Sequence, residues 1–318
     1  MTTTETGVEV SATAAEPEAG TPTSTETQAP DTAGPAEPPP APASTGRTPP
    51  SSLRAAALAM SLIGLLLVGF IVYLYGLSGL AEAHAQSTLY KTFAAQLGAA
   101  TTPVGNNAPE GAPVAIIDIP ELGISGLVIV EGTTSADLTH GPGLLPSSAF
   151  PGQAGVSEVY GRAAMFGGPF EHLMELNRGD RITVVTGQGT STYSVESFGD
   201  TAHPAADPHA NQLVLYTADS SILATDYEQV TADLVSQPKP SAASKGTASA
   251  REAPLAGDAG VAIPLILWSE ALIVVVLGAL ALTRRWSASM VLLYSTPAAL
   301  AVAWAVYENL AILLPNLY

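Results

Sequence analysis

The sequence contains no cysteine and few basic side chains, and both shortages limit its chemistry. Without cysteine it can form no disulfide bond and no thiolate metal site, and it lacks the most common covalent nucleophile after serine. The 318 residues carry 28 Asp and Glu against 11 Lys and Arg, a formal net charge of −17. Such a charge repels phosphate backbones, so a nucleic acid is not an expected partner.

Long apolar runs, in contrast, are present in three places. A helix needs roughly 20 residues to cross the hydrocarbon core of a bilayer. The first run is too long, and lies too far from Met1, for an ordinary cleaved signal peptide. The sequence therefore predicts three transmembrane helices, over residues 54–80, 261–282 and 287–314.

Arginines beside these runs indicate the orientation in the membrane, because basic residues are retained on the cytoplasmic side. The arginines that flank the predicted helix ends are Arg47, Arg54, Arg284 and Arg285. A path of three spans places all four inside when the N-terminus is cytoplasmic. We therefore expect a multi-pass protein of the plasma membrane, with its C-terminus and the long segment between the first two spans outside the cytoplasm.

The segments outside the membrane differ in composition. Residues 1–52 are acidic, rich in Pro and Thr, and almost free of large apolar side chains, which predicts a disordered cytoplasmic tail. Residues 81–103 begin with apolar residues at helical spacing and predict a helical stalk. Residues 104–235 predict a folded domain, and residues 236–259 have the composition of a flexible tether.

The folded domain consists of short β-type segments bounded by Gly and Pro. We expect two short helices, at "TSADLTHG" and "FEHLMEL", and a hairpin in which "GQG" joins two strands between Thr186 and Thr190. Many short strands without long alternating helices predict a mainly β fold, either a barrel or a sandwich. The expected strands cover residues 114–119, 126–132, 156–161, 181–187, 190–197, 212–218 and 227–234.

Six segments between Val114 and Leu234 resemble the sortase family of Gram-positive bacteria, especially the class E type of Actinobacteria. In chain order they are "IPELGI", "EGTTSADLTHGPG", "SAFPGQAG", "FGGPFEHLMELNRGDRITVVTGQGTSTYSV", "LVLYTA" and "VTADL". The resemblance implies a closed β-barrel of about eight strands that works at the cell surface and the cell wall. Sortases cleave a C-terminal sorting signal through a cysteine thioester and then pass the protein to an amine acceptor.

The resemblance also implies where the family's catalytic His, Cys and Arg would lie, and this sequence differs at all three positions. Arg162 occupies the position of the His, Ala218 that of the Cys and Tyr227 that of the Arg. Arginine stays protonated and cannot shuttle protons, a methyl group cannot attack a carbonyl, and a phenol lacks a permanent charge. Because members of a catalytic set act as a unit, the sequence predicts a pseudoenzyme.

The expected function is therefore binding. An inactive accessory protein or scaffold would bind a sorting-signal peptide, a surface protein or an active sortase. The alternative is a cysteine-independent transpeptidase or peptidase that uses Ser220, Ser221 or Thr217, with His140 or His172 as the base, although their spacing forms no recognised pair. In a third interpretation the membrane helices carry the function, and the barrel is an outer shield or sensor.

Three residues are candidates for binding in the groove of such a barrel: Arg162, Thr217 and Tyr227. Arg162 either anchors a carboxylate, such as a peptide terminus, or forms an internal ion pair, and both interpretations stay open. The acids of the folded domain are scattered and form no calcium-loop motif. Neither a metal site nor a cofactor is therefore expected.

Two acids lie inside predicted transmembrane helices, Glu270 in the second and Glu308 in the third. A carboxylate in hydrocarbon is costly and usually faces a partner or a cavity. We expect the two to face one another or a basic residue of another membrane protein, which would make the two C-terminal helices an assembly device. The alternative is that Glu308 reaches the outer headgroups and Glu270 is tolerated in its neutral form.

Overall fold

The structure, a computed structural model, describes residues 51–105, 108–203, 211–219, 225–241 and 249–318. The predicted cytoplasmic tail lies outside the described residues except for its last two positions, which begin a helix.

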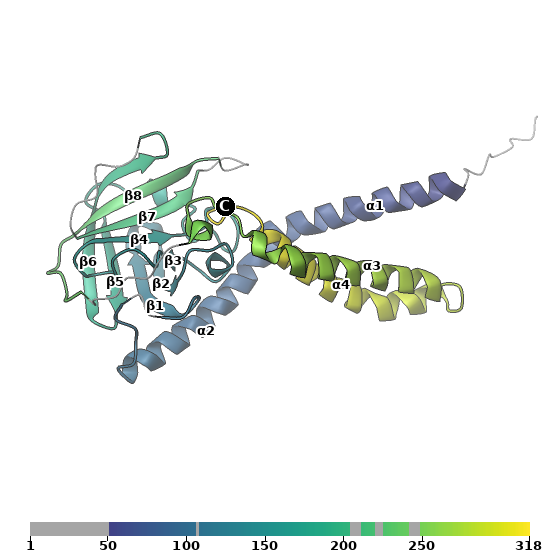
Figure 1. The fold of residues 1–318 in the computed structure, drawn as a ribbon, viewed down its shortest axis with the longest axis horizontal. Helices are drawn as coiled ribbons and strands as arrows, with labels where there is room; N and C mark the ends of the chain where they lie inside the picture. Colours follow the sequence, from purple (N-terminus) through teal and green to yellow (C-terminus); the bar gives the residue numbers. More distant parts are fainter. Residues whose placement is uncertain (1–50, 106–107, 204–210, 220–224, 242–248) are drawn as a thin grey trace, which may run out of the picture. The chain divides into compact units, whose positions relative to one another are not determined.

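Eight strands form a closed barrel in the order β1-β2-β3-β4-β7-β8-β6-β5 (Figure 1). Most neighbouring strands pair antiparallel, whereas β2 with β3 and β4 with β7 pair parallel. The closed barrel, together with the long apolar helices described below, confirms the predicted fold class. The strands are β1 Pro113–Ile119, β2 Ile124–Glu131, β3 Gly143–Leu144, β4 Val156–Tyr160, β5 Arg181–Thr186, β6 Gly189–Asp200, β7 Gln212–Ala218 and β8 Tyr227–Leu234.

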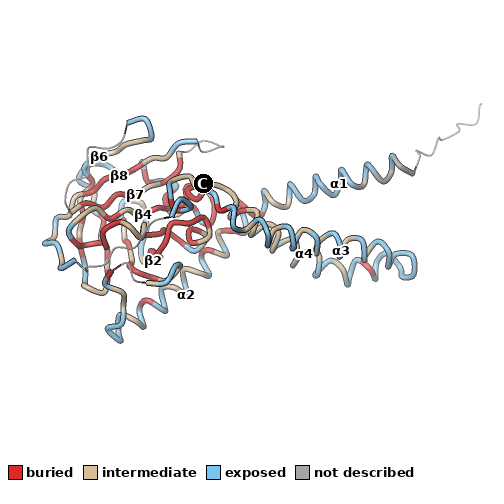
Figure 2. Tube along the Cα trace, viewed as in Figure 1, coloured by how far each residue is buried: buried red, intermediate tan, exposed pale blue. Residues whose placement is uncertain are grey.

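The barrel interior is apolar because alternate side chains of each strand point inward. In β5 every second residue is buried, so its other face meets solvent. β7 is buried along almost its whole length, which indicates that its outer face is covered as well (Figure 2). The core contains, among others, Ile117, Ile129, Val159, Phe170 and Leu215.

Several local predictions can be compared with the structure. The hairpin at "GQG" is confirmed, since Thr186 pairs with Gly189. The two predicted helices are only single 3-10 turns, Asp137–Thr139 and Leu173–Glu175, because Gly and Pro bound both segments closely. Strand β3 was not predicted, since two residues carry no periodicity. Further 3-10 turns are Pro120–Leu122, Ala250–Glu252 and Ala259–Val261.

Three stretches of helix are long and apolar enough to cross a membrane. The first is continuous from α1 (Ser51–Val72) through a π-helical turn (Tyr73–Leu77) into α2 (Ser78–Gly98), so the predicted span and stalk form one helix. The others are α3 (Ala262–Leu282) and α4 (Ala288–Ile312). Their large apolar side chains are mostly exposed, as expected for surfaces that contact lipid (Figure 2).

Helix α2 is held against the barrel by one amide side chain and one aromatic ring. Gln86 accepts a hydrogen bond from the Val128 main-chain nitrogen at 2.8 Å. It also donates to the main-chain oxygens of Val128 at 3.0 Å and His140 at 2.8 Å. Phe93, two turns later, is fully buried. Gln86 therefore satisfies main-chain groups of β2 that would otherwise lie at an exposed edge.

Helix α1 contacts α4 through a glycine. A Cβ atom at Gly69 would come within 2.5 Å of the Tyr307 hydroxyl, so only glycine permits this approach. The same hydroxyl donates a hydrogen bond to the main-chain oxygen of Leu66 at 2.9 Å. Tyr73 lies edge-on to Trp304 with ring centroids 5.1 Å apart. Close packing and one hydrogen bond thus join the first apolar helix to the last.

Candidate functional site

The outer face of β4, β7 and β8 carries a row of aromatic rings. The ring centroids of Tyr160 and Tyr216 are 4.9 Å apart, and those of Tyr216 and Tyr227 are 5.6 Å apart. Ala218, the last residue of β7, pairs directly with Tyr227, so both side chains lie on this face. The methyl group of Ala218 is 2% exposed. We call the surface formed by Tyr160, Tyr216, Ala218 and Tyr227 the groove floor.

Arg162 follows β4 by two residues and is fully buried. Its Nε donates to the main-chain oxygen of Leu138 at 3.1 Å. Its Nη2 donates to the main-chain oxygen of Ser135 at 2.8 Å and to the Ser135 hydroxyl at 2.9 Å. Its Nη1 donates to the main-chain oxygen of Tyr318 at 3.1 Å, and the guanidinium lies 4.9 Å from the centre of the Phe166 ring.

Burial lowers the pKa of Arg162 to about 9, because a buried charge loses its hydration. The side chain is therefore still a cation at neutral pH. Within the described residues no Asp or Glu pairs with it, and its donors go to main-chain oxygens and one hydroxyl. Arg162 thus binds oxygen atoms of two separate segments, the turn at 135–138 and the chain at Tyr318, as a planar fork can.

Residues 313–318, which follow α4, lie over the groove floor. Leu317 is fully buried and packs in one apolar cluster with Tyr160, Ala163 and Ala218. The main-chain oxygen of Leu317 accepts a hydrogen bond from the Ala163 nitrogen at 2.8 Å. The floor is therefore covered by a segment of the same chain, and we call residues 313–318 the covering segment.

Asn316, in the covering segment, is also fully buried. Its Nδ2 donates to the main-chain oxygens of Thr133 at 2.7 Å and Ala253 at 3.1 Å. Its main-chain nitrogen donates to the oxygen of Ala256 at 2.9 Å. The amide thus joins three segments, and a substitution would leave buried carbonyl groups without this donor.

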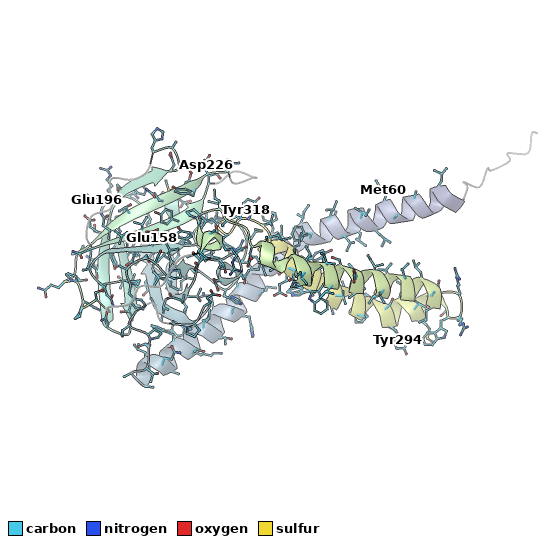
Figure 3. The ribbon with its side chains drawn as sticks, in the orientation of Figure 1. Met60, Glu158, Glu196, Asp226, Tyr294 and Tyr318 are labelled. Atoms are coloured by element: carbon cyan, nitrogen blue, oxygen red, sulfur yellow. The ribbon has the colours of Figure 1, made fainter. Side chains whose placement is uncertain are left out.

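Tyr318 lies between the barrel and the helices (Figure 3). Its hydroxyl forms a hydrogen bond of 3.0 Å with the hydroxyl of Tyr75, in the π-helical turn. Its main-chain oxygen binds Arg162. One residue therefore contacts both the first long helix and the buried cation of the groove.

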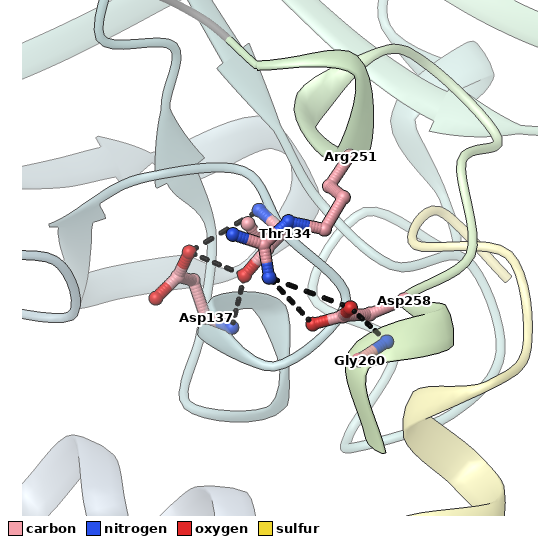
Figure 4. Close-up of polar contacts among 5 residues, drawn as sticks. All are labelled: Thr134, Asp137, Arg251, Asp258 and Gly260. Carbon is pink, nitrogen blue, oxygen red and sulfur yellow. Dashed lines mark hydrogen bonds and ion pairs between the residues drawn. The ribbon is translucent and has the colours of Figure 1, made fainter. Parts of the chain in front are cut away.

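A polar layer beside the groove fixes the loops around it (Figure 4). Asp137 accepts hydrogen bonds from the nitrogen and hydroxyl of Thr134, at 3.2 and 2.6 Å. Arg251 pairs with Asp258 at 3.4 Å, and Asp258 caps the following turn by accepting from the Gly260 nitrogen at 2.8 Å. These contacts hold the 3-10 turn at 137–139 and the chain before α3 in place.

Glu131, at the end of β2, is 3% exposed. Burial and, to a smaller extent, the nearby carboxylates of Glu252 and Asp137 raise its pKa to about 7. Burial also raises the pKa of Asp137, although hydrogen bonds from Thr134 oppose this effect. Across the described ranges no three His, Asp or Glu side chains are arranged to hold a metal ion.

The residues proposed for an alternative catalytic mechanism are separated. Thr217 alternates with Ala218 along β7, so its side chain points away from the groove floor, toward the interior face shared by Leu215. His140 and His172 are exposed. No hydrogen bond joins either histidine to Thr217 in the part of the chain that the structure describes. Ser220 and Ser221 lie outside the described residues.

The intramembrane acids are both exposed on their helices. No hydrogen bond or ion pair joins Glu270 to Glu308, or either to another side chain, within residues 249–318. A contact of the two acids with one another, or with a basic residue of another membrane protein, stays a prediction.

The structure thus brings Arg162 and Tyr227 to one region and separates Thr217 from it. The covering segment was not expected from the sequence. Residues 287–314 were assigned to a membrane helix, and a short polar end after such a helix carries no signal of where it docks. The one local hint was the polar residue Asn316 among the apolar residues of this segment.

The barrel is similar to a known protein family. Residues 117–228 match the model of the sortase domain. The barrel is therefore similar to the sortase domain over this range. It covers the sortase-like strands from β1 to the start of β8, and therefore includes Arg162, Ala218 and Tyr227.

Solved sortase structures are similar to part of this chain. Sortase D5 transpeptidase of Clostridium perfringens is 21% identical, with 48% of this chain and 99% of that chain covered and a TM-score of 0.41. Sortase E of Streptomyces avermitilis is 26% identical, with 42% and 97% covered and a TM-score of 0.36. Sortase E1 of Streptomyces coelicolor, with a tripeptide in its active site, is 23% identical, with 41% and 95% covered and a TM-score of 0.37. A search of curated proteins gave no match.

Proposed function

We propose that this protein is a non-catalytic, membrane-anchored member of the sortase family that binds a peptide on the groove floor. The observation that carries the proposal is the buried methyl group of Ala218 at the end of β7, where sortase chemistry needs a thiol. Within the described residues 211–219, Thr217 does not compensate for it, since its side chain points to the other face of the strand. Covalent catalysis requires an activated nucleophile, and the groove floor offers none.

The groups around Ala218 also favour binding over chemistry. Arg162 remains a cation below a pKa of about 9, and an arginine without an acceptor atom is a poor proton shuttle. Burial raises the pKa of the Tyr160 and Tyr216 phenols, which are therefore neutral. Neutral aromatic rings and a buried fork of donors suit an extended peptide, whose carbonyl oxygens need donors and whose side chains need apolar contacts.

The proposed partner is a sorting-signal peptide, a surface protein or an active sortase, outside the cytoplasm. Three helices that can span a membrane support anchoring, and the arginines at their ends support an N-terminus inside and a barrel outside. An anchored groove without chemistry would hold a substrate or an enzyme near the membrane, as an accessory protein or scaffold does.

A direct test uses the full-length protein in detergent and a labelled peptide mimic of a sorting signal that carries an electrophile. We expect no covalent adduct and no released fragment, from the wild-type protein or from Thr217→Val. Ala218→Cys is the matched control, because it introduces a thiol at the floor and should form an adduct with the electrophile without multiple turnovers.

Release of the C-terminal fragment by the wild-type protein, with multiple turnovers, would overturn the proposal in favour of the cysteine-independent enzyme. In that event Ser220→Ala and Ser221→Ala would identify the nucleophile by loss of turnover.

A further inference from the structure

We infer that the covering segment, residues 313–318, is a built-in ligand of the groove that any external peptide must displace. This inference rests on the proposed function of the groove as a peptide site. The segment contacts the groove as a bound peptide would, through main-chain hydrogen bonds, one buried amide and one buried leucine.

The contacts define a pattern for the peptide that fits. Leu317 is fully buried and packs in one apolar cluster with Tyr160, Ala163 and Ala218. The nitrogen of Ala163 binds the main-chain oxygen at the same position, at 2.8 Å. A peptide with a branched apolar residue there gains both contacts.

The preceding position selects an amide. The Nδ2 group of Asn316 reaches two main-chain oxygens, of Thr133 and Ala253, which lie in different loops. An apolar residue would leave both oxygens without that donor, and a carboxylate would repel them. The following position places its main-chain oxygen on Arg162, a donor that is indifferent to the side chain. The structure therefore assigns an Asn-Leu-x peptide class to the groove.

The covering segment also links the groove to the membrane. It begins directly after α4, which ends at Ile312, and its Tyr318 hydroxyl contacts Tyr75 of the first long helix. The segment can leave the groove only if these contacts change. An external peptide can bind only when the segment has left the groove. The apparent affinity is therefore the intrinsic affinity multiplied by the fraction of molecules in which the groove is open.

The position of the covering segment in solution can be tested by cysteine pairs in the full-length protein, since the natural chain has no thiol. Two pairs are used, Ala163→Cys with Leu317→Cys and Ala218→Cys with Leu317→Cys. We expect at least one pair to form an intramolecular disulfide under mild oxidation. The control pair, Ala163→Cys with Ser287→Cys, should not, because Ser287 precedes the first residue of α4 whereas Leu317 follows its last. Absence of a disulfide in both test pairs of folded protein would overturn the inference.

Competition is tested with a fluorescent synthetic peptide of sequence LLPNLY, which copies the covering segment. The double variant Asn316→Ala with Leu317→Ser should bind it roughly tenfold or more tightly than the wild type, because the internal competitor is weakened. Leu293→Ser removes an exposed leucine of α4 and should leave the affinity unchanged. The disulfide-locked protein should bind no peptide until a reductant is added.

Equal binding by locked and reduced protein would also overturn the inference. A different outcome separates the two proposals. Suppose that the disulfide forms, and that the double variant is folded, as judged by its thermal transition, but binds no peptide. The covering segment is then a fixed part of the fold, and the proposed peptide-binding function is wrong.

Discussion

The interior of the barrel and its groove face share the strands β4 and β7 but are stabilised in different ways. Inside, Val159 and Leu215 belong to a large cluster of buried apolar side chains. On the groove face, the fully buried Arg162 and Asn316 are stabilised by hydrogen bonds to main-chain oxygens from distant segments. Apolar packing tolerates many sequences of similar volume, whereas a buried polar network works only when every partner is in place. The groove face should therefore be the more specific of the two.

The largest effect is expected from a cavity in the interior. Phe170 is fully buried, and its ring packs so closely on Gly161 that no Cβ would fit there. Phe170→Ala should lower the free energy of unfolding by about 3–5 kcal/mol, measured by denaturant unfolding of the full-length protein in detergent. Met174→Ala, at a residue that is 40% exposed, is the control and should change it little. A similar loss in both variants would contradict the description of the core.

A smaller loss is expected on the groove face. Arg162→Lys keeps the charge but cannot supply donors in a fork to Leu138, Ser135 and Tyr318 together. The free energy of unfolding should fall by about 2–3 kcal/mol, because hydrogen bonds from a charged group are lost. Unchanged stability would show that the buried fork is dispensable.

The pH dependence of the free energy of unfolding provides a separate test, at the buried acid Glu131. The pKa of Glu131 is raised to about 7 in the folded state. An acid with a raised folded pKa favours folding when it is protonated, so its contribution is most favourable below the unfolded value near 4.5. Stability should therefore fall as the pH rises from about 4.5 to about 7, and stay lower above it.

Glu131→Gln removes this titration. The variant should be more stable than the wild type at pH 8, and its thermal midpoint should vary less between pH 5 and 7. Glu175→Gln, on an exposed side chain, is a suitable control. A wild-type protein that gains stability as the pH rises over this range would refute the assignment of a buried, protonated Glu131.

The smallest effect concerns the helices, where packing rather than burial from water gives the energy. Gly69→Ala would place a Cβ within 2.5 Å of the Tyr307 hydroxyl, whereas Gly64 has no atom within 4 Å of such a Cβ. Gly69→Ala should cost about 1–3 kcal/mol in thermal unfolding in detergent, and Gly64→Ala nothing. Adding Tyr307→Phe should recover part of the loss by removing the clashing oxygen. Equal effects of the two glycine variants would contradict this packing.

The sequence predicted most of the strands because strand alternation and turn residues are local signals, whereas the closed barrel was expected from the resemblance to the sortase family. The hairpin after Thr186 is an example, since glycine at a positive φ is readable from "GQG". The two-residue strand β3 could not be predicted, because its pairing depends on neighbours distant in sequence. The groove showed the same limit. Arg162 could be singled out as unusual, but its partner at Tyr318 is 156 positions away, and no local pattern encodes such a contact.

The π-helical turn at Tyr73–Leu77 has a consequence for the register of the first long helix. A π-turn holds one residue more than an α-turn, so the helix after it is rotated relative to an uninterrupted one. Winding the same residues as an α-helix, with no extra residue held in this turn, would rotate everything downstream by about 100°. Gln86 and Phe93 would then face away from β2 while Tyr73 kept its place beside α4. One inserted residue thus sets the angular relation between the part of this helix that faces its membrane neighbour and the part that holds the barrel.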